Sequence, residues 1–218
     1  MPVPDRAGSP GSLDGPLHDA TTARLGLRAP VAEDAGVLHE RVMTDPRTWE
    51  LDAALRPGAA VEVAEQLRTQ VERWRRHGLG SWVVRELAGP GAGAPVGIGG
   101  CSLPTDRAWN LAFRLRPAVW GRGYGVELAV AALTAAHRVR PDLPVTAVAV
   151  EANAPSRRVL ERSGLVEVAR APDPRGLSPS PVCLHADRPL PQELVQALLA
   201  WRPRRPPVVP DGAAPGAG

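Results

Sequence analysis

A glycine-spaced segment, residues 121–125 (Gly-Arg-Gly-Tyr-Gly), constrains the fold of this chain more than any other feature. Before it, residues 109–116 alternate as a strand with one buried face does, with Trp109, Leu111, Phe113 and Leu115 on that face. After it, apolar residues recur at helical spacing at Val126, Val130 and Leu133. Alternate glycines leave backbone N–H groups open at a helix N-terminus, which favours negative charge. The segment therefore predicts an anion-binding turn, although glycines that only shape a strand-to-helix turn give the same pattern.

Apolar periodicity predicts the elements around this turn. Strands are expected at residues 24–28, 81–87, 96–103, 145–150, 166–169 and 182–186. Helices are expected at residues 31–42 and 60–77, in a short segment from Pro155 to Gly164, and at residues 193–201. The order βααβββαβαββ is an α/β pattern with central hairpins.

The chain of 218 residues, 44% of them hydrophobic, is long enough for one domain with a substantial core. Residues 1–22 and 203–218 are rich in Pro and Gly without apolar periodicity, so both are expected to be disordered tails. The domain itself is expected at residues 23–188, followed by a helical extension at residues 189–202.

Charge and cysteine usage exclude several classes of function. The formal net charge is +3, and the arginines are dispersed among 23 acidic residues, which argues against a nucleic-acid surface. No apolar run is long enough to span a bilayer, and the start lacks a secretory pattern, so a cytoplasmic protein without membrane partners is expected. Cys101 and Cys183 form no CxxC pair and the five histidines are scattered, which predicts buried thiols and no metal site.

Three motifs in register resemble those of the GCN5-related N-acetyltransferase (GNAT) superfamily. They are residues 117–125 (PAVWGRGYG), 153–156 (NAPS) and 159–165 (VLERSGL). Within the superfamily, Trp120 followed by Gly121 is typical of the branch that acetylates ribosomal-protein N-termini, the RimJ/RimL type. The resemblance covers roughly residues 23–188. It implies the acyl-CoA N-acyltransferase fold, an α/β fold with a mixed, mostly antiparallel central sheet flanked by helices.

The same resemblance implies acetyl-CoA as the acetyl donor, without a metal. Its pyrophosphate is expected on the backbone amides of the glycine turn, and its pantetheine arm along the preceding strand. Asn153 matches the family's asparagine near that arm, although an asparagine at this position also satisfies local backbone groups at a helix start. The implied cofactor-binding residues are Phe113, Arg114, Leu115, Gly121, Arg122, Gly123, Tyr124, Gly125, Val126 and Asn153.

The catalytic groups are less complete in this sequence. Many family members carry a tyrosine general acid at the position of Leu160, and some carry a glutamate base at the position of Val148. Ser156, with Asn153 the expected catalytic pair, either donates a hydrogen bond to the sulfur or serves in the first turn of its helix.

The leading interpretation is an N-acetyltransferase that moves acetyl from acetyl-CoA to a primary amine, by direct attack of a protein N-terminus or a small-molecule amine. The alternative is a non-catalytic acyl-CoA-binding module, which Leu160 and Val148 keep open. A phosphoryl-transfer P-loop is set aside because no Lys-Ser/Thr follows the glycines. Residues 48–57 and the last strand pair are expected to select the acceptor, and a monomer and a homodimer are both compatible with the sequence.

Overall fold

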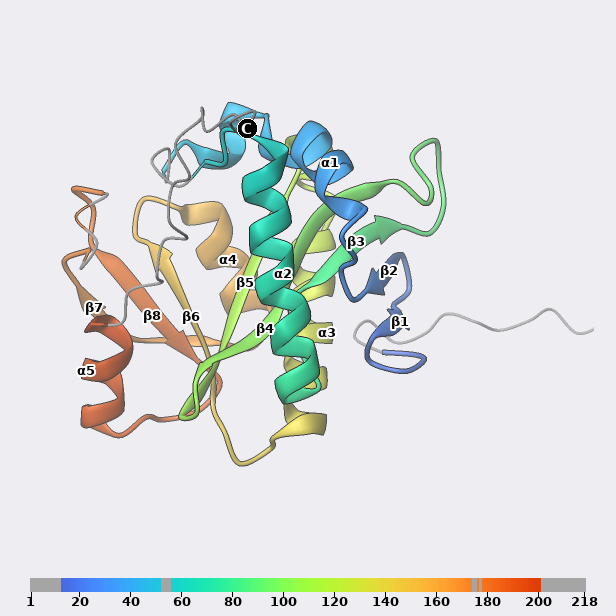
Figure 1. The fold of residues 1–218 in the computed structure, drawn as a ribbon. Coiled ribbons are helices and arrows are strands. Elements are labelled where there is room, and N and C mark those ends of the chain that lie inside the picture. The colour runs from blue at the N-terminus through green and yellow to red at the C-terminus, as the bar shows by residue number, and fades with distance from the viewer. Residues whose placement is uncertain (1–12, 52–55, 174–175, 177, 201–218) are drawn as a thin grey trace, which may run out of the picture.

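The computed structural model of the chain describes residues 13–51, 56–173, 176 and 178–200. They form an eight-stranded sheet with the order β1-β2-β3-β4-β5-β6-β8-β7 (Figure 1). All neighbouring strands run antiparallel except β5 and β6, which are parallel. The strands are β1 (Asp19–Thr21), β2 (Leu25–Arg28), β3 (Trp82–Glu86), β4 (Pro95–Thr105), β5 (Ala108–Leu115), β6 (Val145–Val150), β7 (Val166–Ala171) and β8 (Val182–Ala186).

Helices cover both faces of this sheet (Figure 1). On one face lie α1 (Asp34–Leu38), which continues as the π-helix η1 (His39–Met43), the 3₁₀ helix η2 (Pro46–Trp49) and α2 (Ala60–His77). On the other face lie α3 (Tyr124–Val139) and α4 (Ala154–Arg162). The short η4 (Pro117–Val119) joins β5 to the glycine turn, and α5 (Gln192–Ala200) lies at the β7–β8 end.

Two apolar clusters hold these layers together. The larger one lies between the sheet and α3 and α4, and it includes Trp82, Trp109 and Leu128, all fully buried. The smaller one joins α1, η1, η2 and α2 to the opposite face through Leu38, Leu67 and Val83. Among the helices that the structure describes, none combines the length and apolar content needed to cross a membrane.

The fold class and the order of the elements agree with the sequence analysis, with one strand added. Residues 13–22, expected in the N-terminal tail, are ordered, which corrects this boundary. Leu13 is buried, and β1 pairs with β2 in a register that places Ala20 opposite Leu27. The apolar residues of this segment show no regular spacing, so the sequence pattern does not predict β1. The strand forms because it pairs with β2. Residues 1–12 and 201–218 of the expected tails lie outside the described residues.

Helix α3 forms where it was predicted, but a different face points to the core. Leu128, Ala131, Ala132 and Ala135 are fully buried, whereas Val126, Val130 and Leu133 are only partly buried. Small alanine side chains let the helix approach the sheet closely, and a helix that is apolar on most sides does not reveal its buried face by periodicity.

Candidate active site

The parallel strands β5 and β6 pair over only part of their length. Trp109 lies opposite Val145 and Asn110 opposite Thr146, and the register of these strands gives no further partner pair. Beyond Asn110, β5 continues for five residues to Leu115. This stretch keeps β4 on one side and has an open edge toward β6.

The hydrogen bonds of β5 show which backbone groups face that open edge. The N–H of Arg116 donates to the carbonyl of Val96 at 2.9 Å, and the N–H of Trp109 donates to Pro144 on the β6 side, also at 2.9 Å. Because antiparallel ladders alternate, the N–H and C=O groups of Phe113 face β6. Those of Arg114 face β4, so the main chain of Arg114 is directed away from the open edge expected to hold the pantetheine arm.

The carbonyl of Leu115 also faces the open edge, and a neighbouring side chain already uses it. The indole Nε1 of Trp120 donates to this oxygen at 2.7 Å, while 51% of Trp120 is exposed. A carbonyl oxygen has two lone pairs, so Leu115 keeps one acceptor position.

The glycine turn follows directly and ends at the N-terminus of α3. Gly121 (φ 77°) and Gly123 (φ 79°) adopt left-handed conformations that other residues disfavour. The first hydrogen bond within the helix joins the Glu127 N–H to the Gly123 carbonyl at 3.1 Å. The N–H groups of residues 124–126 therefore have no partner inside the helix and are available to an anion. A Cβ on Gly121 would meet no atom within 4 Å, so the turn opens into free space.

Side chains from distant segments surround this turn. Glu86 of β3, almost fully buried, accepts from the Tyr124 hydroxyl at 3.0 Å and from Arg122 Nη1 at 3.1 Å. Arg24, just before β2, donates to the Arg122 carbonyl at 2.8 Å and pairs with Glu127 at 2.7 Å. Sequence reasoning missed Arg24 and Glu86, because these contacts span 36 to 103 residues and leave no local pattern.

The N-terminus of α4 lies at the same end of the sheet, since β5 and β6 run parallel (Figure 1). A Cβ on Gly125 of α3 would come within 3.1 Å of Val159 of α4, so the two helices pack tightly. Asn153 Oδ1 accepts from the Ser156 N–H at 3.1 Å and caps α4. This geometry supports the capping role of Asn153 and leaves its amide nitrogen free of that contact.

Ser156 is half-buried in the first turn of α4, and its hydroxyl has no hydrogen-bond partner among the described residues. Leu160, at the position of the family's tyrosine, is 2% exposed and belongs to the core. Val148, at the position of the family's glutamate, is 46% exposed. Ser156 is thus the hydroxyl at this end of α4 that is not committed to the fold.

A hollow of about 390 Å³ lies beside η2, in the region expected to select the acceptor. Its lining consists of Pro46, Arg47, Trp49, Glu50 and Arg56. The Arg114 side chain ties it to β5, because its guanidinium lies 3.5 Å from the Trp49 ring centre and donates to the Thr48 carbonyl. The hydrogen bond from Arg47 lowers the pKa of Asp45. Residues 52–55 of the expected acceptor segment lie outside the described residues.

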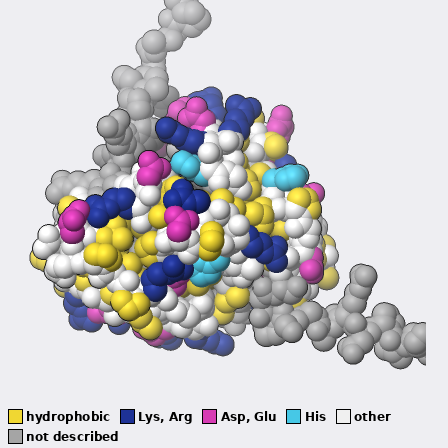
Figure 2. Space-filling model, turned by 90° about the horizontal axis from the view of Figure 1, so that it is seen from below, with side chains coloured by type: hydrophobic (Ala, Val, Ile, Leu, Met, Phe, Trp, Pro, Cys, Tyr) yellow, Lys and Arg dark blue, Asp and Glu magenta, His cyan; other side chains and the backbone are white. Residues whose placement is uncertain are grey.

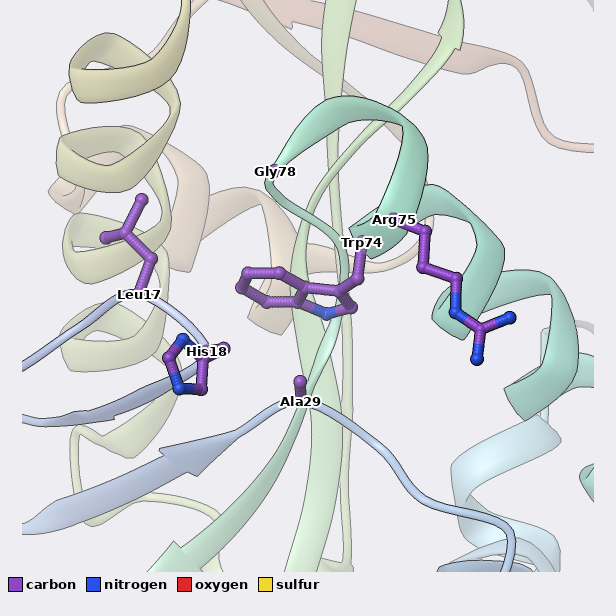
Figure 3. Close-up of a pocket in the computed structure, with 6 residues that line it drawn as sticks. All are labelled: Leu17, His18, Ala29, Trp74, Arg75 and Gly78. Atoms are coloured by element: carbon purple, nitrogen blue, oxygen red, sulfur yellow. The ribbon is translucent and has the colours of Figure 1, made fainter.

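A second hollow, of about 330 Å³, lies between β1, β2 and the C-terminal end of α2 (Figure 3). The Trp74 ring points toward Leu17 and His18, whereas Arg75 points away. None of the expected site residues lines this second hollow, so it has no part in the proposed catalysis. The face shown in Figure 2 carries acidic and basic side chains interspersed, without a continuous basic patch among the described residues.

Cys101 and Cys183 are buried and unpaired, as expected, and burial raises the pKa of both thiols. The described ranges contain no group of three or more side chains that could hold a metal ion. His185 of β8 is fully buried and its Nε2 lacks a partner within the described structure, and desolvation lowers its pKa.

Comparison with known proteins identifies relatives of this chain by sequence and by fold. A sequence model of the acetyltransferase (GNAT) domain matches residues 24–166. An acetyltransferase (GNAT family) from Bacillus anthracis superposes with a TM-score of 0.62 at 18% identity, covering 76% of this chain and 95% of its own. RimL, a ribosomal L7/L12 α-N-protein acetyltransferase, superposes in its apo form with a TM-score of 0.63 at 16% identity, over 76% and 90%. The complex of RimL with coenzyme A superposes with a TM-score of 0.62 at 15% identity, covering 76% of this chain and 94% of its own. No curated protein matches the sequence. At sequence identities of 15% to 18%, the similarity to these solved structures shows a shared fold.

Proposed function

This chain belongs to the acetyltransferase (GNAT) family, whose members are acetyl-CoA-dependent N-acetyltransferases, and we propose that it acetylates a primary amine by direct attack on the thioester. The observation that carries the proposal is the continuity of two backbone surfaces. The open edge of β5 leads from Phe113 to Leu115, and the free N–H groups of the glycine turn follow within ten residues. One surface suits an amide-rich arm and the other suits a pyrophosphate.

The residues fit acetyl-CoA in this arrangement. The backbone groups of Phe113 and the N–H of Leu115 would hold the pantetheine arm, and the amides of Gly121 to Val126 would hold the pyrophosphate. When bound, acetyl-CoA supplies the thioester carbonyl that an uncharged amine attacks. The side-chain amide of Asn153 can donate a hydrogen bond toward the same arm while its oxygen caps α4.

Ser156 is the residue that we assign to proton transfer. Its uncommitted hydroxyl can donate a hydrogen bond to the departing sulfur, a role for which the buried Leu160 has no polar atom. Neither Val148 nor Leu160 can remove a proton from the incoming ammonium group, so water is the base in this proposal.

The hollow beside η2 is the proposed acceptor site. The Glu50 carboxylate has no hydrogen-bond or ionic partner among the described residues and can attract a protonated amine. RimL acetylates a ribosomal protein at its α-amino group, and its shared fold supports peptide N-termini as the first acceptors to test.

A cytoplasmic location is part of the same proposal. Two buried cysteines without a disulfide suit a reducing compartment, which supports a cytoplasmic location.

The test is release of CoA over a panel of peptide N-termini and small amines, with the acetylated product identified by mass spectrometry. Acetylation of an amine supports the proposal. Binding of acetyl-CoA with no acetylated product across the panel favours the non-catalytic module instead, and failure to bind acetyl-CoA overturns both.

A further inference from the structure

We propose that Arg24 is a positioning residue for the cofactor site, which it serves by fixing the direction of the Gly123 N–H group. The inference rests on the proposed pyrophosphate site at residues 121–126. It concerns a side chain almost a hundred residues away in sequence that belongs to none of the three family motifs.

The first step is the hydrogen bond from Arg24 Nη1 to the Arg122 carbonyl, 2.8 Å long. No cis peptide bond occurs in the described residues, so the Arg122–Gly123 peptide is trans and planar. In such a peptide the C=O of one residue and the N–H of the next point in opposite directions. Arg24 holds this carbonyl and thereby directs the Gly123 N–H to the opposite side of the peptide, away from the guanidinium.

The second step is that Arg24 is itself held in place. Its Nε donates to Glu127 Oε2 at 2.7 Å, and its own backbone N–H donates to Glu127 Oε1 at 2.8 Å. The Thr22 hydroxyl donates to the same Oε1 at 2.6 Å, and the guanidinium lies 4.8 Å from the centre of the Tyr124 ring. The planar fork of arginine serves the carboxylate through Nε and the carbonyl through Nη1, whereas lysine offers a single nitrogen for both.

The third step is the need for such support. A turn built from glycines has more backbone freedom than any other, and an anion site made of its N–H groups must restrict that freedom before it binds. Glu127 lies in the first turn of α3, where a carboxylate would oppose a bound pyrophosphate by charge alone. Because Glu127 pairs with Arg24, it stabilises the glycine turn through that arginine.

The experiment measures acetyl-CoA affinity by calorimetry in Arg24→Met, Arg24→Lys and Glu127→Gln. Both Arg24 variants should bind about tenfold more weakly, because a charge-assisted hydrogen bond that orients the turn is lost. S-acetylpantetheine, which lacks the pyrophosphate, should bind to all three variants as it does to the wild type, as followed by NMR titration. Arg140→Gln, which removes an exposed arginine at the other end of α3, is the matched charge control and should bind acetyl-CoA normally.

Glu127→Gln separates positioning from simple charge attraction. Removal of a negative charge near a polyanion would tighten binding if charge alone mattered, whereas loss of the support for Arg24 weakens it. Tighter binding by Glu127→Gln, or wild-type affinity in Arg24→Lys, overturns the positioning role. Retained binding in Gly123→Glu would overturn the pyrophosphate site itself, which keeps the two failures distinct. Thermal melting shows that each variant is folded.

Discussion

The glycine turn and the N-terminus of α4 lie at the same end of the sheet but are built in different ways. The turn offers backbone N–H groups, and the side chains of Arg24 and Glu86 bond to it from up to 98 residues away in sequence. The start of α4 offers the side chains of Asn153 and Ser156, and the hydrogen bond between these two residues spans three positions. The proposed donor site therefore depends on the whole fold, whereas the proposed chemistry depends on single side chains of one helix start.

The largest effect should come from a change in the turn itself. Gly123→Glu puts a negative side chain into the proposed anion site, at a left-handed φ that residues other than glycine disfavour, so acetyl-CoA binding should be abolished in a calorimetric titration. Gly89→Glu is the control, because Gly89 also has a positive φ (98°) with free space around it but lies in the β3–β4 hairpin. Unchanged affinity in Gly123→Glu would contradict the assignment of the turn.

A smaller effect, restricted to turnover, should come from the other region. Ser156→Ala should lower kcat by roughly 100-fold, as expected for loss of a positioned proton donor, and leave the acetyl-CoA affinity unchanged. Steady-state kinetics and calorimetry measure the two quantities separately. Equal loss of both would reduce Ser156 to a structural part of α4, and the contrast between the two regions would then disappear.

Substitutions at Asn153 test whether one side chain both caps α4 and contributes to acetyl-CoA binding. Asn153→Ala removes the cap and should reduce the free energy of unfolding by about 1 kcal/mol. Asn153→Asp keeps an oxygen for the Ser156 N–H, so it should restore stability but bind acetyl-CoA more weakly, because it lacks the amide donor. Denaturant unfolding and calorimetry measure these effects. If Asn153→Asp restores both stability and affinity, Asn153 acts only as a cap.

The smallest effect concerns His185, which touches neither region. Desolvation lowers its pKa below 6.5, and the groups that act on it are Cys183, Glu167, Arg157 and Glu161. Below pH 6.5 the unfolded chain binds a proton that the folded protein does not, so stability should fall as the pH decreases and should be unaffected above it. His185→Leu should show a flatter dependence of melting temperature on pH between 6.5 and 5. Identical pH profiles for the two proteins would show that His185 does not contribute.

The sequence was informative where structure is local. The glycine turn, the cap and end of α4, and the alternation of β5 were all predictable, because each depends on residues within a few positions of one another. What could not be predicted depends on packing between distant segments. The pairing of residues 13–22 with β2, the buried alanine face of α3, and the direction of the Arg114 backbone follow from neighbours that the local pattern does not contain.

The short pairing of β5 with β6 also bears on the mechanics of the molecule. Among the described residues, only two residue pairs join strands β1–β5 to strands β6–β8, so the sheet has a seam near its middle. The packing of α3 against α4 and the connecting chain hold the two sides together across it. A ligand that bonds to the open edge of β5 would act as a missing strand there. Amide hydrogens along this seam should therefore exchange with solvent more slowly once it is filled, including on strands that the ligand does not touch.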